Sequence, residues 1–121
     1  MTRGNFIKSG RSFEAEVSGI KIRINDSAMS DENVQLAANI IQAYPHRVTA
    51  IADHILQDEW IAAAYKLSKD EIIQKLHLPV IRIDKFGCML SYCENEIDFD
   101  HILDIEFSGV LENFYQVGMD G

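Results

Sequence analysis

Alternation of apolar and charged side chains marks a β-hairpin near the start of the chain. The segments SFEAEV and IKIRIN place an apolar side chain at every second position, on either side of Ser18-Gly19, and glycine suits a two-residue hairpin turn. Pairing about this turn sets Val17 opposite Ile20 and Glu16 opposite Lys21. The same register adds the pairs Ala15–Ile22, Phe13–Ile24 and Glu14–Arg23. We therefore expect a hairpin with one apolar and one charged face.

After this hairpin the apolar positions follow a helical period. Ser30 is suited to cap a helix whose first turn is acidic. Pro45 favours the first position of a helix, so the pattern predicts that a second helix begins there and continues through Tyr65, antiparallel to the first. The apolar stripe of the first helix consists of Val34, Ala37, Ile41 and Tyr44. That of the second consists of Val48, Ile51, Ala52, Ile55, Leu56, Ala62 and Ala63.

The rest of the chain predicts one short helix and then four strands. Ser68-Lys69-Asp70-Glu71 is a capping box, and the helix that it opens ends near Leu78-Pro79. The strand-like segments that follow are PVIRID, CMLSYC, DHILDIEF and VLENFYQV, and short turns between them favour an antiparallel meander. The predicted architecture is a single α+β domain spanning residues 1–121. It has the order ββαααββββ and an antiparallel sheet with the helices packed on one face.

Charge is distributed unevenly along the chain, which has a net charge of −8. Residues 1–85 hold all eleven Lys and Arg and eleven of the nineteen acids, so the whole imbalance lies after Lys85. The eight remaining acids are Glu94, Glu96, Asp98, Asp100, Asp104, Glu106, Glu112 and Asp120. Such a surface argues against nucleic-acid binding and favours a cationic partner, while simple solubility is the alternative explanation.

Several classes of protein lack their usual markers in this sequence. No apolar run suggests a signal peptide or a membrane span, so we expect a cytoplasmic protein. Cys88 and Cys93 lie five residues apart in extended chain and cannot pair with each other, which suggests reduced thiols. No glycine fingerprint for nucleotides and no nucleophile elbow occurs. We therefore predict neither an enzyme nor a cofactor.

The densest group of polar residues lies between Asp98 and Glu106. Strand alternation predicts that His101 points with the apolar side chains, away from the nearest acids, while Asp104 and Glu106 face solvent. An alternative is a metal-dependent enzyme or metal sensor that uses His101 with Asp98 and Asp100. A further mixture of His and acids, at His46, Asp53, His54, Asp58 and Glu59, is interpreted as a solvated helix face because HExxH is absent.

One resemblance rests on the helix run HILQDEWIAAAYKLSKDEIIQKLHLP, the segment Asp100-His101-Ile102, the turn Glu106-Phe107-Ser108-Gly109 and the terminal Asp120-Gly121. With these residues, about the last two thirds of the chain resembles a bacterial domain family known as domain of unknown function 2262. Here an acidic stretch, residues 94–98, replaces the aromatic-rich stretch that the family usually has before the histidine. The resemblance implies an α+β domain of the bacterial cytoplasm, of the kind found among immunity components of toxin systems.

Together these features predict a small acidic protein-binding module, most concretely an immunity-type protein that neutralises a toxin by covering a basic surface. Trp60, near the end of the predicted second helix, could anchor an interface because aromatic side chains are enriched in binding hot spots. Self-association through an exposed strand or the Trp60 region, giving a homodimer, is a third hypothesis. We expect no bound metal. The predicted partner contacts are Trp60, Asp98, Asp100, Asp104, Glu106 and Glu112.

Overall fold

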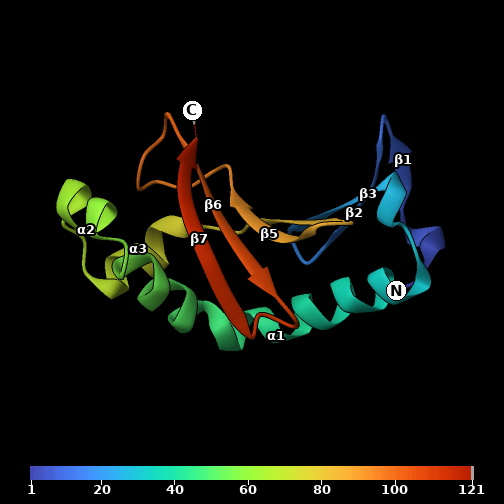
Figure 1. Cartoon of the computed structure of the whole chain (residues 1–121), viewed down its shortest axis with the longest axis horizontal. Helices are drawn as coiled ribbons and strands as arrows, with labels where there is room; N and C mark the ends of the chain where they lie inside the picture. The colour runs from blue at the N-terminus through green and yellow to red at the C-terminus, as the bar shows by residue number, and fades with distance from the viewer. Residues whose placement is uncertain (121) are drawn as a thin grey trace.

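The computed structural model of the chain describes residues 1–120, so Gly121 lies outside the described residues. Seven strands form one sheet in the order of the sequence, with three α-helices between the third and fourth strands. Figure 1 shows α1 running along one side of the sheet, with α2 and α3 following at its end. The strands are β1 Ile7–Ser9, β2 Ser12–Val17, β3 Ile20–Asn25, β4 Val80–Asp84, β5 Gly87–Tyr92, β6 Ile102–Ser108 and β7 Asn113–Asp120. The helices are α1 Asp31–Leu56, α2 Glu59–Tyr65 and α3 Lys69–Leu76, and two short 3₁₀ turns lie at Arg3–Asn5 and Asp26–Ala28.

The predicted hairpin is confirmed in strand limits and in register. Strands β2 and β3 pair with Val17 opposite Ile20 and with Glu16 opposite Lys21, and Ser18 and Gly19 both adopt positive φ in the turn. The sequence prediction missed β1, a three-residue strand on the outer edge of this hairpin. It also predicted an antiparallel sheet, and the sheet is mostly antiparallel, but β3 and β4 are parallel because three helices intervene and return the chain to the same end of the sheet.

The prediction of two helices meeting at Pro45 is wrong, because α1 continues through this residue over 26 residues. A proline removes one backbone donor from a helix and crowds the preceding turn, which disfavours this arrangement. Burial compensates for the cost, since Tyr44 on one side of Pro45 and Ile51 and Ile55 on the other are packed in the same core. The helix ends at Leu56, before the residues that the prediction had included in it.

The starts of the helices follow their sequence signals. Ser30 caps α1 by accepting a hydrogen bond from the Asn33 N–H, and Asp58 caps α2 in the same way through the Ile61 N–H. The predicted capping box at the start of α3 is confirmed, with reciprocal bonds of 3.2 and 3.0 Å between Ser68 and Glu71.

Strand alternation divides the sheet into a core face and an outer face. The core face carries the buried side chains of the central strands, and α1 packs on it. The hydroxyl groups of Tyr44 on α1 and Tyr92 on β5 meet 2.6 Å apart inside this core. Burial raises the pKa of Tyr44 to about 12 and raises the pKa of Tyr92 well above its usual range, so both stay neutral. None of the three helices in residues 1–120 combines the length and apolar character needed to cross a membrane.

Candidate functional site: the outer face and the β5–β6 loop

We use "outer face" for the side of the sheet that points away from α1. Registers across the strands define a transverse row on this face, which runs from Glu14 through Arg23, Arg82 and Met89 to Glu106. A second row runs parallel to the first and consists of Glu16, Lys21, Val80, Ser91, Asp104 and Gly118. The charge of the outer face therefore changes sign twice across the sheet, from acidic on β2 to basic on β3 and β4 and back to acidic on β6.

The acidic end of the outer face is built by β6 and β7. Leu103, Ile105 and Phe107 are buried, while Asp104 and Glu106 between them face outward, as strand alternation predicts. Asp120 joins them, because it pairs with Ile102 and so lies diagonal to Asp104 on the neighbouring strand. Among residues 1–120, none of the acids that follow Lys85 lies within ion-pair distance of a Lys or Arg.

Asp104 is the acid at this end of the outer face whose pKa is raised. Burial raises the pKa of Asp104, and the neighbouring Asp120 carboxyl group raises it further. The Ser91 hydroxyl, which donates to Asp104 Oδ1 over 2.7 Å, lowers this pKa, and the positive charge of Arg82 acts in the same direction. A cation brought against these carboxylates would therefore stabilise their ionised form.

The raised pKa of Asp104 has a measurable consequence for the free energy of unfolding. When the pKa of a carboxyl group is higher in the folded than in the unfolded chain, the folded state loses stability as the pH rises through the folded pKa. We expect Asp104→Asn to raise the free energy of unfolding at pH 7 by up to about 1 kcal/mol. The gain should vanish below about pH 4, where the unfolded carboxyl group is also protonated. Urea unfolding of Asp104→Asn at pH 7 and below about pH 4 tests this, with Glu16→Gln as the control. A lower free energy of unfolding for Asp104→Asn at pH 7 would contradict the expectation.

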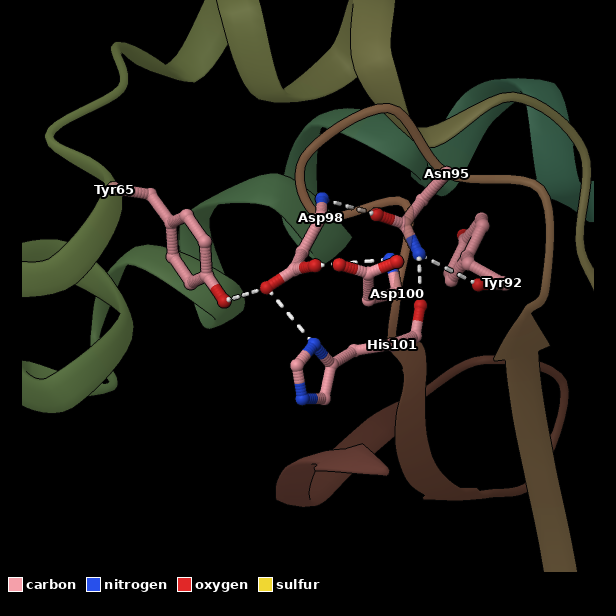
Figure 2. Close-up of polar contacts among 6 residues, drawn as sticks. All are labelled: Tyr65, Tyr92, Asn95, Asp98, Asp100 and His101. Carbon is pink, nitrogen blue, oxygen red and sulfur yellow. Dashed lines mark hydrogen bonds and ion pairs between the residues drawn. The ribbon is translucent and has the colours of Figure 1, made fainter. Parts of the chain in front are cut away.

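A second group of polar residues lies in the loop from Cys93 to His101, which Figure 2 shows in close-up. Asn95 organises this loop, since its side chain is 2% exposed and makes three hydrogen bonds. Its amide nitrogen donates to the carbonyl groups of Tyr92 (2.9 Å) and His101 (3.0 Å), and its oxygen accepts from the Asp98 N–H (2.9 Å). Asn95 therefore joins the two ends of the loop, at Tyr92 and His101, to Asp98 in its middle.

Asp98 connects this loop to α2. Its Oδ2 accepts a hydrogen bond of 2.6 Å from the Tyr65 hydroxyl, and its Oδ1 accepts one of 3.0 Å from the Asp100 N–H. His101 Nδ1 lies 2.9 Å from the same Oδ2, close enough for an ion pair. The prediction that His101 points with the core and away from the acids is therefore wrong, because His101 precedes β6 and does not follow its alternation.

The contacts of Asp98 shift its own pKa and the pKa values of Tyr65 and His101. Hydrogen bonds with His101 and Tyr65 lower the pKa of Asp98 to about 2. The same carboxylate raises the pKa of Tyr65 to about 12 and raises the pKa of His101. Asp98 is thus an ionised residue whose oxygens are already occupied by neighbours of the same chain, which suits it to positioning the loop more than to binding a partner.

The six predicted contact residues do not form one surface. Asp104 and Glu106 lie together on the outer face, while Asp98 and Asp100 lie in the β5–β6 loop. Trp60 is 63% exposed on α2 and packs edge-on against Tyr65 at 6.0 Å between ring centroids, which brings it near Asp98. Glu112 lies apart, in the turn between β6 and β7, where its carboxylate accepts a hydrogen bond from the Val110 N–H. Within residues 1–120, no three His, Cys, Asp or Glu side chains are grouped so that they could hold a metal ion.

Sequence reasoning missed several residues that shape these sites. Tyr65 was considered only as an interface anchor beside Trp60, and its bond to Asp98 and the role of Asn95 gave no local signal, because these contacts depend on the path of a loop. Asp120 was counted among the terminal acids, but its position beside Asp104 depends on an irregularity in the pairing of β6 with β7 between Ile105 and Phe107. Comparison with known proteins adds no further guide, since no family model, curated protein or solved structure matches the chain.

Proposed function

We propose that this chain is a protein-binding module of the immunity type, which covers a basic surface of a toxin through the acidic end of its outer face. The observation that carries the proposal is the group of Asp104, Glu106 and Asp120 on β6 and β7. Ion pairs with lysine or arginine do not neutralise these carboxylates within residues 1–120, and the raised pKa of Asp104 reflects both its burial and the nearby Asp120 carboxyl group.

A cationic partner would relieve the repulsion between these carboxylates. Its binding would be favoured in two ways. Its lysine or arginine side chains would form charge-assisted hydrogen bonds with the carboxylates. The field of a chain with a net charge of −8 would also speed the approach of a basic protein. Steric cover of a basic toxin surface would then block the substrate of that toxin without any chemical step, so the proposal requires no catalytic residue.

We expect the partner to be the protein encoded beside this chain. The binding experiment uses the basic domain of that protein. We expect that domain to bind the chain, with an association rate that falls roughly tenfold between 50 and 300 mM salt because attraction between opposite charges is screened. Surface plasmon resonance at a series of salt concentrations measures this rate. A neighbouring protein without a basic domain, an absence of binding, or a rate insensitive to salt would contradict the proposal.

A further inference from the structure

The outer face carries two stripes of opposite charge separated by an uncharged strand. We call Lys21, Arg23 and Arg82, on β3 and β4, the basic stripe. We call Asp104, Glu106 and Asp120, on β6 and β7, the acidic stripe. Between them, the side chains of β5 that point to this face are Met89, which is partly exposed, and Ser91, which is buried. The stripes therefore lie on either side of a neutral centre line.

The registers show how evenly the stripes are spaced about that line. Met89 pairs with Arg82 on one side and with Glu106 on the other, so these two charges lie two strands apart, at about 10 Å. That spacing is too large for a direct ion pair, and within residues 1–120 no ion pair joins the basic stripe to the acidic stripe. Arg23 instead pairs with Glu14 on β2, and Arg82 contacts the sulfur of Met89.

This arrangement is complementary to itself under a two-fold rotation. When a second copy is turned over about an axis along β5 and laid against the first, the strands on one side of β5 come to face those on the other side. Arg82 of each copy then faces Glu106 of the other, and the two Met89 side chains meet at the axis. We propose that the outer face is a dimer interface whose occupant is a second copy of this chain, in an isologous contact that forms the Arg82–Glu106 pair twice.

Apolar side chains around the stripes favour the same contact. Tyr115 is 54% exposed and borders a shallow hollow with Arg82, Met89 and Glu106. Ile102 is 39% exposed at the far end of β6. A tyrosine beside an arginine is a feature of interface hot spots. A second copy carries the matching charges by symmetry, because Arg82 and Glu106 lie on opposite sides of Met89.

The dimer would cover the acidic stripe that the proposed function assigns to a basic partner. A second copy and the toxin domain would then compete for one surface. In the absence of the toxin domain, the acidic stripe would be covered in the dimer. The inference does not depend on the proposed function, because dimerisation is measured with the pure chain alone and partner binding at chain concentrations low enough to give monomer.

Sedimentation of reciprocal charge variants tests the dimer. We expect the natural chain to pass from monomer to dimer between roughly micromolar and submillimolar concentrations, and less so at high salt. Arg82→Glu alone and Glu106→Lys alone should each stay monomeric, since each places like charges at both contacts. An equal mixture of the two should associate again, because one copy is then acidic and the other basic on either side of β5.

Glu16→Lys is the matched control, since it makes the same charge change on the same face but on β2, outside the proposed contacts. It should dimerise as the natural chain does, and circular dichroism should show all variants folded. A natural chain that is monomeric throughout, a dimer that strengthens with salt as its net negative charge is screened, or a mixture of the two variants that fails to associate would each overturn the inference.

Discussion

Replacing Asn95 with alanine is expected to lower the free energy of unfolding by about 3 kcal/mol. The side chain is buried and its three hydrogen bonds are made to backbone groups of the β5–β6 loop. Alanine would leave the carbonyl groups of Tyr92 and His101 and the N–H of Asp98 without this partner. Each such loss costs on the order of 1 kcal/mol or more where water does not replace the bond.

Asn39→Ala provides the comparison for this variant. Asn39 is exposed on α1 and its side chain accepts one hydrogen bond, from Gln35. Its replacement should change stability by no more than about 0.5 kcal/mol, because surface substitutions have small effects and alanine favours a helix. Urea unfolding followed by circular dichroism compares the two. A cost for Asn95→Ala below about 1 kcal/mol would show that the loop does not depend on this side chain.

Local patterns in the sequence were sufficient for the features that depend on neighbouring residues. The hairpin about Ser18-Gly19, the capping box at Ser68 and the outward orientation of Asp104 and Glu106 are confirmed, because turn chemistry, capping and strand alternation act over a few residues. The last four strands also form the predicted antiparallel meander, although the last strand begins at Asn113, three residues later than predicted. The α+β class followed from these elements.

Features that depend on tertiary packing were not predictable in this way. Pro45 gave a valid local signal for a helix start, but burial of the apolar stripe on both sides kept one helix continuous. The parallel pairing of β3 with β4 depends on where three helices return the chain. In β7 one extra residue opposite Glu106 reverses the alternation, so that Val117 pairs with Ile105 and Asp120 comes to the outer face.

The second large expected effect concerns the binding of a basic partner. Neutralising two carboxylates of the outer face, in Asp104→Asn/Glu106→Gln, should slow association by about tenfold and speed dissociation, since the variant loses two charge-assisted contacts. The fold should survive, because Glu106 is exposed and the amide oxygen introduced at position 104 can still accept a hydrogen bond from Ser91. Glu16→Gln/Glu59→Gln changes the net charge equally and removes none of the ion pairs seen in residues 1–120.

The central claim, that β6 and β7 present carboxylates to a cationic partner, is tested most directly by the association rates of these two double variants with the basic protein domain that is proposed as the partner. Measured at low salt and nanomolar concentration, Asp104→Asn/Glu106→Gln should associate about ten times more slowly than the natural chain, and the control pair should change the rate by less than about twofold. Equal rates for the two double variants would contradict the claim, because the effect would then belong to net charge and not to the carboxylates of β6.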